Sequence, residues 1–221
     1  MTATETLIYS IAYPNRVPDG TFGSLLDRMP GAIAQKITRY RRWEDAHASL
    51  FGKLLLMTAL AEAGSTATLH DLQYNAFQRP FLDKGPDFNI THSGNRVACI
   101  LGRTGRVGID LEAIRPMPIE DFRQQFTQGE WAAITGAPEP MSVFYHYWTA
   151  KESLIKADGR GLNIPLDQLV IDQGPGIVLG DHEWQLRRID AFMGYACHIA
   201  TEGSCEPIIK EMSLAEILTG K

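Results

Sequence analysis

Cysteine and long apolar runs are both scarce in this 221-residue chain. It has three cysteines, none in a Cys-x-x-Cys spacing, and the odd number argues against a disulfide framework. No apolar run approaches the roughly 20 residues that a membrane-spanning helix needs. The N-terminal residues also lack the basic start and long apolar stretch of a secretion signal. We therefore expect reduced thiols, a cytoplasmic location and no association with a membrane.

The chain also has no excess of positive charge. The net charge is −5, so no molecule-wide basic field attracts nucleic acid, and we expect no nucleic-acid partner. Neither the Gly-rich dinucleotide fingerprint after a strand nor the P-loop motif occurs, so folds built on them have no support. The nucleophile elbow of the α/β-hydrolases is absent too. The remaining composition, 44% hydrophobic and 21% charged, is ordinary for a globular protein.

The spacing of apolar residues predicts a chain that alternates between groups of strands and groups of helices. The expected strands are 7–13, 72–77, 88–91, 97–101, 107–111, 169–172, 183–190 and 195–200. The expected helices are 31–63 with a break near 42–45, 119–134, 141–158 and a short last helix begun by a capping box at Ser213. Residues 14–23 are typical of a loop, and 88–111 of a small antiparallel meander.

This order of elements predicts an α+β fold with two lobes of similar plan. We place the lobes at residues 1–106 and 107–221. Because a two-lobed chain can build its whole site alone, we expect a monomer.

Residues 148–161 carry the most informative motif. On a helix, Glu152 and Lys156 lie one turn apart on the same face. A carboxylate placed there can hold a cation or take a proton, and an ammonium can receive charge from a departing phosphate oxygen. An isolated Glu/Lys pair at this spacing is more often a solvated surface pair, so the motif gains its meaning from the rest of the sequence.

A second motif is the pair of acids at Asp110 and Glu112. Residues two apart in a strand point to the same face, so these carboxylates project together. A cation relieves the repulsion between them, and oxygen ligands of this kind suit Mg²⁺ bound together with waters and substrate phosphates. An exposed edge strand with two solvated acids is the alternative explanation.

Two further features suit a phosphate. His92 follows a strand and enters a tight turn, where its ring, Thr91 and the turn amides can hydrogen-bond an anion. A basic patch is formed by Lys36, Arg39, Arg41 and Arg42. This patch can hold a phosphate or attract an acidic partner, and it is equally well explained as a solvated helix face. The other five histidines form no zinc spacing.

Taken together, these segments resemble the Sfp-type 4′-phosphopantetheinyl transferases. The matching motifs, in the family's order, are R-W-E-D-A-H at 42–47 with S-L at 49–50 and G-K at 52–53, R-P at 79–80, F-N-I-T-H-S-G at 88–94, G-I-D-L-E at 108–112 and W-T-A-K-E-S-L-I-K-A-D-G-R-G-L at 148–162. The resemblance covers roughly residues 30–200, and the last two motifs are highly specific as a pair.

The resemblance implies two similar α+β lobes related by a pseudo-twofold axis, with coenzyme A in the cleft between them. It implies a transferase of the holo-acyl-carrier-protein synthase type with Mg²⁺ as its cofactor. Such an enzyme moves the 4′-phosphopantetheine arm of coenzyme A to a serine of an apo acyl, aryl or peptidyl carrier protein. It releases adenosine 3′,5′-bisphosphate.

Residue roles follow from the same resemblance. Asp110, Glu112 and Glu152 are expected to hold Mg²⁺ on the coenzyme A pyrophosphate. Glu152 is expected to take the proton of the carrier serine, directly or through a water, while Lys156 neutralises the leaving phosphate. The expected contacts to coenzyme A come from Lys36, Ser49, Arg79, Thr91, His92 and Lys156.

Two positions depart from the family's pattern. Gln78 stands where many members have glycine, and Ile33 stands where some relatives carry a second phosphate-binding lysine. The alternatives to an active transferase are a non-catalytic module that binds coenzyme A or a carrier protein, and a Mg²⁺-dependent phosphodiesterase that cleaves coenzyme A without a carrier.

Overall fold

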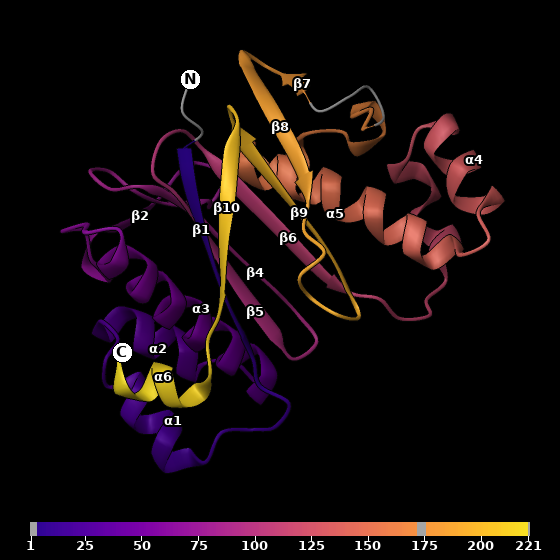
Figure 1. The fold of residues 1–221 in the computed structure, drawn as a ribbon. Coiled ribbons are helices and arrows are strands. Elements are labelled where there is room, and N and C mark those ends of the chain that lie inside the picture. The colour runs from indigo at the N-terminus through magenta and orange to yellow at the C-terminus, as the bar shows by residue number, and fades with distance from the viewer. Residues whose placement is uncertain (1–3, 172–175, 221) are drawn as a thin grey trace.

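The computed structural model of this chain describes residues 4–171 and 176–220. Two four-stranded sheets form its centre, and Figure 1 shows helices covering the outer face of each sheet. The first sheet has the order β10-β1-β5-β4, with β1 (Thr4–Ala12), β4 (Asp87–Ser93), β5 (Arg96–Gly102) and β10 (Cys205–Glu211). The second has the order β6-β9-β8-β7, with β6 (Val107–Ala113), β7 (Gly176–Leu179), β8 (His182–Arg188) and β9 (Tyr195–Glu202).

The helices and a small hairpin complete the fold. The helices are α1 (Asp19–Leu26), α2 (Gly31–Thr38), α3 (Trp43–Glu62), α4 (Gln128–Gly136), α5 (Pro140–Asp158) and α6 (Leu214–Thr219). The hairpin joins β2 (Leu72–Tyr74) to β3 (Pro80–Leu82). Among the described residues no helix is both long and apolar enough to cross a lipid bilayer. The mixture of helices and mainly antiparallel strands confirms the predicted α+β class.

The central strands are apolar on both faces because each sheet is covered by helices on one face and by the other sheet on the opposite face. In β1, Leu7, Tyr9 and Ile11 pack into a core with α3. Ile8, from the opposite face of β1, packs instead against the second sheet, in a core that includes Ile109 of β6. A strand buried on both faces loses the apolar/polar alternation of a half-exposed strand. The layers therefore run helix, sheet, sheet, helix.

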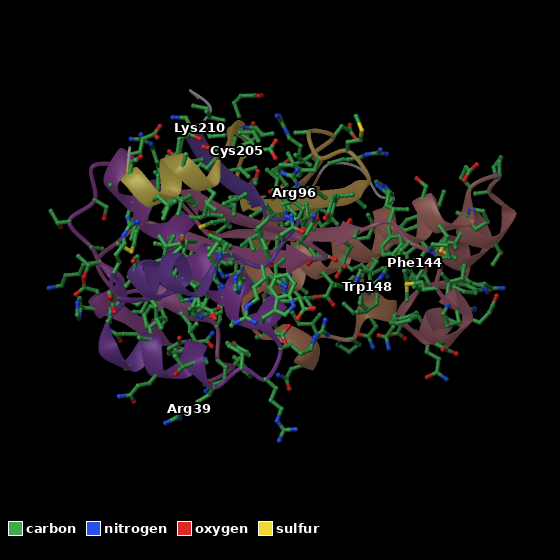
Figure 2. The ribbon with its side chains drawn as sticks, turned by 90° about the horizontal axis from the view of Figure 1, so that it is seen from below. Arg39, Arg96, Phe144, Trp148, Cys205 and Lys210 are labelled. Carbon is green, nitrogen blue, oxygen red and sulfur yellow. The ribbon has the colours of Figure 1, made fainter. Side chains whose placement is uncertain are left out.

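The outer face of the second sheet is covered by α5. Leu154 of that helix and Trp184 of β8 belong to one core and have no measurable solvent exposure. Toward the N-terminal part of the helix, Phe144 and Trp148 stack with ring centroids 6.0 Å apart, at the end of the molecule seen in Figure 2. Gly108 allows α5 to approach β6 closely, because a Cβ there would lie 2.1 Å from the Ser153 carbonyl oxygen.

The predicted helix break and most predicted strands are confirmed. Helix α2 ends at Thr38 and α3 begins at Trp43, so the break lies just before the expected position. No strand was expected at β3, β7 or β10, and the structure adds all three. β10 pairs in parallel with β1, and α6 packs on the first core through Ile217. The division of the chain into lobes at residue 107 stays a prediction, and the segment 205–219 lies with the first sheet.

Four local predictions were wrong. Residues 88–111 do not form a meander, because β6 pairs with β9 and not with β5. The segment 119–134 is not one helix: a 3₁₀ helix ends at Gln125, and Thr127 begins α4 with a capping box. Residues 14–23 are not all loop, since α1 begins at Asp19.

The strand expected at 169–172 is absent over 169–171, and residue 172 lies outside the described residues. The backbone there serves a different purpose. The carbonyl oxygens of Leu166 and Leu169 accept hydrogen bonds from the buried Lys151 ammonium at 2.7 and 2.8 Å. Lys151 also pairs with Glu130 at 2.7 Å, and both side chains have at most 1% of their surface exposed. A buried charge needs such partners, so these carbonyls are not available to a strand ladder.

Candidate active site

Strands β4 and β6 lie side by side, and side chains join them where backbone pairing would be expected. The backbone N–H groups of Val107, Ile109, Leu111 and Ala113 donate to side-chain oxygens of Asp87, Asn89, Thr91 and Ser93. Each pair is 20 residues apart, so the two strands run in parallel. We name this set of four hydrogen bonds the seam. It connects the edge of the first sheet to the edge of the second.

The seam brings Thr91 to Asp110. The Thr91 hydroxyl donates to Asp110 Oδ1 at 3.3 Å and accepts from the Lys156 ammonium at 3.3 Å. Lys156 Nζ, from α5, also lies 2.5 Å from Asp110 Oδ1. Asp110 is buried, with 3% of its surface exposed, and its second oxygen, Oδ2, has no hydrogen-bond partner among the residues that the structure describes. A buried carboxylate oxygen without a partner is costly, and a bound cation is one way to satisfy it.

Two more carboxylates face this position. Glu112 accepts a hydrogen bond from the Ser93 hydroxyl at 2.6 Å, and burial followed by the charge of Asp110 raises the pKa of Glu112. Burial, and then the charge of Asp110, raises the pKa of Glu152 from 4.5 to about 7. Glu152 comes from α5 and the other two acids from β6, so the predicted pairing of a strand with a helix does bring the three acids within electrostatic reach.

Lys156 is the cation at the centre of this acidic group. Burial works to lower its pKa, but Asp110, Glu152 and Glu112 outweigh it and raise the pKa. The ammonium is therefore charged at neutral pH. Its pairing with Asp110 gives the acids a counter-ion within the chain itself.

The oxygen donors of the three acids suit a divalent ion. Among residues 4–171 and 176–220, no three His, Cys, Asp or Glu side chains already stand at metal-ligand distances. The chemistry of the donors nevertheless fits Mg²⁺, which binds through few carboxylates plus waters and phosphate oxygens. The unpartnered Asp110 Oδ2 and the desolvated Glu152 both gain from a nearby cation. The acids are thus gathered, without being pre-assembled into a full ligand shell.

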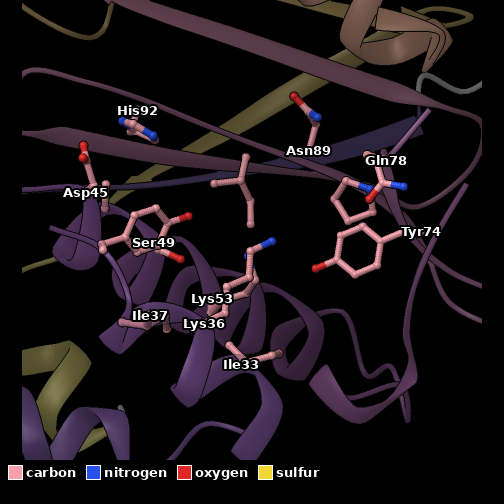
Figure 3. Close-up of a pocket in the computed structure, with 14 residues that line it drawn as sticks. Ile33, Lys36, Ile37, Asp45, Ser49, Lys53, Tyr74, Gln78, Asn89 and His92 are labelled. Carbon is pink, nitrogen blue, oxygen red and sulfur yellow. The ribbon is translucent and has the colours of Figure 1, made fainter. Parts of the chain in front are cut away.

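A cavity of about 390 Å³ lies between the helices of the first sheet and β4, and its wall includes Asn89 and His92 of that strand. Its lining includes three of the residues expected to contact coenzyme A, namely Lys36, Ser49 and His92. Figure 3 shows Lys36 and Lys53 directed into the cavity from the helices below, with His92 and Asn89 above. His92 links the cavity to the acids: partial desolvation, and then the charge of Lys156, lowers its pKa.

Lys53 was not among the predicted site residues. Its ammonium lies in the cavity on α3, and burial, followed by a smaller effect of Lys36, lowers its pKa. Two lysine side chains that line the same cavity have a natural partner in a multiply charged anion. The only sequence signal was the G-K pair at 52–53, which falls on a helix face that otherwise reads as core.

Arg79 and Thr91 have different surroundings from the other predicted contacts. Arg79 has 8% of its side chain exposed and forms a two-point ion pair with Asp87, at 2.6 and 2.9 Å. It also donates to the carbonyl oxygens of Lys156 and Val107 at 2.9 and 3.1 Å. Its guanidinium is therefore engaged where β4, β6 and α5 meet, while Thr91 belongs to the seam and does not line the cavity.

Gln78, also in the cavity wall, has an unusual backbone. Its φ is +66°, the only positive value at a non-glycine residue in the described part of the chain. An L-residue in the left-handed region costs about 1–2 kcal/mol. The loop thus keeps a conformation suited to glycine although it carries a long polar side chain.

Comparisons with known proteins agree with this arrangement. The family model of the 4′-phosphopantetheinyl transferase superfamily matches residues 106–199, which include the three acids and Lys156. A 4′-phosphopantetheinyl transferase of Bacillus subtilis is 33% identical over 154 residues, covering 66% of this chain and 68% of the relative. The 4′-phosphopantetheinyl transferase gsp of Aneurinibacillus migulanus is 32% identical over 166 residues, covering 74% of this chain and 70% of the relative.

A relative from a yeast is also similar to this chain. The L-aminoadipate-semialdehyde dehydrogenase-phosphopantetheinyl transferase of Schizosaccharomyces pombe is 28% identical over 178 residues, covering 70% of this chain and 68% of the relative. The chain therefore belongs to the 4′-phosphopantetheinyl transferase superfamily, enzymes that transfer the phosphopantetheine group of coenzyme A to carrier proteins.

Proposed function

We propose that this protein transfers the 4′-phosphopantetheine arm of coenzyme A to the serine of an apo acyl, aryl or peptidyl carrier protein, with Mg²⁺, and releases adenosine 3′,5′-bisphosphate. The observation that carries the proposal is the convergence of Asp110, Glu112 and Glu152 on Lys156 beside a cavity that holds two lysines. The acids suit a metal-bound pyrophosphate, and the lysines suit a terminal phosphate.

Asp110, Glu112 and Glu152 are the residues that would hold Mg²⁺. When bound, the ion supplies positive charge to the pyrophosphate oxygens during displacement. The orphaned Asp110 Oδ2 supports this assignment, since no protein group satisfies it among the described residues.

Glu152 is the proposed proton acceptor. In the metal-free site, burial and the charge of Asp110 raise the pKa of Glu152 to about 7, so its carboxylate accepts a proton more readily than an ordinary glutamate does. Its carboxylate takes the proton from the carrier serine, directly or through a water. The serine oxygen then forms a bond to the β-phosphorus of coenzyme A, and the bond from that phosphorus to the bridging oxygen of the nucleotide breaks.

Lys156 is the proposed group that receives the charge on that bridging oxygen. Its raised pKa keeps the ammonium protonated throughout the neutral range. One well-placed charge of this kind typically contributes about 10²–10³ in rate.

The cavity takes the nucleotide half of coenzyme A. Lys36 and Lys53 bind its 3′-phosphate, with His92 and Ser49 beside them. Thr91 holds Asp110 in place through the seam. Arg79 contributes as a positioning residue, because its contacts to Asp87 and to the Lys156 carbonyl fix the loop and helix around the nucleotide. We further propose a monomer that works in the cytoplasm, without membrane or nucleic-acid partners.

The test offers a panel of purified apo carrier proteins to the enzyme with coenzyme A and Mg²⁺, and scores each carrier by mass. A gain equal to the phosphopantetheine arm on at least one acyl, aryl or peptidyl carrier supports the proposal. Asp110→Asn serves as the matched control and is expected to leave every carrier unchanged.

The same assay separates the alternatives. A non-catalytic module binds coenzyme A or carrier without any mass gain. A phosphodiesterase releases adenosine 3′,5′-bisphosphate at the same rate with and without carrier. Either result, obtained with the whole panel, contradicts the proposal.

A further inference from the structure

The loop that joins β2 to β3 has a backbone geometry that favours glycine at one position, although the residue there is Gln78. The Gln78 N–H donates to the Asn75 carbonyl oxygen at 3.0 Å, and the Asn75 N–H donates to the Arg79 carbonyl oxygen at 3.0 Å. This is a three-residue hairpin loop, in which a turn is followed by one residue in the left-handed region, and glycine is the usual choice there. The left-handed position is Gln78, with φ +66°.

The side chain of Gln78 is what distinguishes this loop from one with glycine. It lines the cavity, and no protein hydrogen bond to its carboxamide occurs within the described ranges 4–171 and 176–220. The rest of the loop is held firmly: Asn75 Oδ1 accepts from the N–H groups of Phe77 and Arg79, both at 2.9 Å. A loop with a fixed backbone thus presents a solvent-exposed amide donor and amide acceptor at the cavity wall. Backbone strain of this kind is a reason to look for function at the residue that carries it.

The wall around Gln78 suits a planar base. Tyr74 and Pro80 are paired across the hairpin and both line the cavity. The Tyr74 ring is 47% exposed, and Lys36 Nζ lies 5.6 Å from its centroid. Figure 3 places Gln78 near Tyr74, with the two lysine ammonium groups toward the middle of the cavity. The cavity wall thus offers an aromatic ring, an amide and two lysines, groups that suit the base and the phosphate of a nucleotide.

We propose that the Gln78 carboxamide hydrogen-bonds the N6/N7 edge of the adenine of coenzyme A and makes this enzyme selective for adenine. The inference rests on the proposed function. A carboxamide offers one acceptor and one donor in the same plane, which fit the adenine N6 amino group and N7 together. Hypoxanthine carries an oxygen in place of the amino group and leaves the amide oxygen without a donor.

Two variants of Gln78 separate the amide from the loop. Gln78→Ala removes the carboxamide and keeps a side chain in the strained position, whereas Gln78→Gly removes the carboxamide and relieves the strain. Both are expected to bind coenzyme A about tenfold more weakly than the wild type by calorimetry, and equally so. The melting temperature of Gln78→Gly is expected to equal or exceed that of the wild type by up to about 4 °C, so its loss of affinity does not come from misfolding.

The selectivity is tested with the coenzyme A analogue that has hypoxanthine in place of adenine. The wild type is expected to bind it about tenfold more weakly than coenzyme A, and both variants are expected to bind the two ligands alike. Wild-type affinity in Gln78→Ala, or equal binding of the two ligands by the wild type, overturns the inference. If the wild type binds no coenzyme A at all, the proposed function fails as well, so the two failures are distinguishable.

Discussion

Replacing Glu152 by glutamine gives the most direct test of the electrostatics of the site. The change keeps the shape of the side chain and removes its charge. Raising the pKa of this carboxyl from 4.5 to about 7 means that ionising it costs the folded protein about 3 kcal/mol. Glu152 is partly exposed, so this value is an upper limit.

The sign of the pH dependence follows from the two pKa values. Below about pH 4.5 the carboxyl is protonated in both the folded and the unfolded chain, and its favourable contribution to folding is complete. As the pH rises toward about 7, the unfolded chain loses the proton and the folded chain retains it, so stability falls. Above that range the carboxyl is ionised in both the folded and the unfolded chain, and the folded protein bears the full free-energy cost of the buried charge. Glutamine does not ionise, so the variant does not lose this stability.

The assay is thermal unfolding of the wild type and Glu152→Gln in metal-free buffer from pH 5 to 8.5. The variant is expected to be the more stable protein at pH 8.5 by up to about 3 kcal/mol, or a melting temperature higher by up to about 10 °C. Most of that difference is expected to develop between pH 5 and 7.5. Added Mg²⁺ is expected to stabilise the wild type at pH 8.5 more than the variant, because the ion offsets the charge that glutamine lacks.

Transfer activity gives the second readout. Loss of the proton acceptor is expected to lower the rate of carrier modification by at least about 10²-fold. A stability difference that stays constant from pH 5 to 8.5 would refute the desolvated carboxylate. Retention of most of the activity would refute its role as proton acceptor.

Three further predictions concern packing, phosphate binding and carrier association. Gly108→Ala is expected to lower the free energy of unfolding by about 1–3 kcal/mol or more in a denaturation experiment, because its Cβ would lie 2.1 Å from a backbone oxygen of α5. The control in the same experiment is Gly23→Ala, whose Cβ would have no atom within 4 Å. Lys53→Met is expected to weaken binding of coenzyme A by about 10–100-fold in calorimetry but to change binding of 3′-dephospho-coenzyme A little, and equal losses for both ligands would contradict its phosphate contact. Neutralising the exposed arginines of the basic patch, Arg39 and its neighbours, is expected to slow carrier association in stopped-flow measurements, more strongly at low salt; a loss independent of salt would point to a different cause.

The outline of the fold was predictable because the apolar residues follow regular patterns. Strands such as β1 and β5 are apolar runs with turn residues at their ends, and the break before Trp43 was visible as a new helix start. The pairing of strands was less predictable. Asp87, Asn89, Thr91 and Ser93 alternate along β4, but nothing local to the sequence says that their oxygens replace a neighbouring strand.

The site was predicted in part for a similar reason. Motif spacing identified the acids of β6 and α5, whose electrostatic coupling the structure makes evident. That Lys53 lines a cavity was not predictable, because a lysine on a mostly apolar helix does not indicate that a cavity opens at that turn. The expected contact of Arg79 with coenzyme A stays a prediction; its partner Asp87 and the carbonyl groups around it were not predictable, because only folding brings them together.

The side-chain links between β4 and β6 have a mechanical consequence. Four hydrogen bonds in a row, with Thr91 in both the row and the acidic group, mean that the halves of the molecule cannot swing apart without also disturbing Asp110. A clamshell motion of one sheet away from the other would have to break these hydrogen bonds, so we expect substrate entry and product exit to proceed without it.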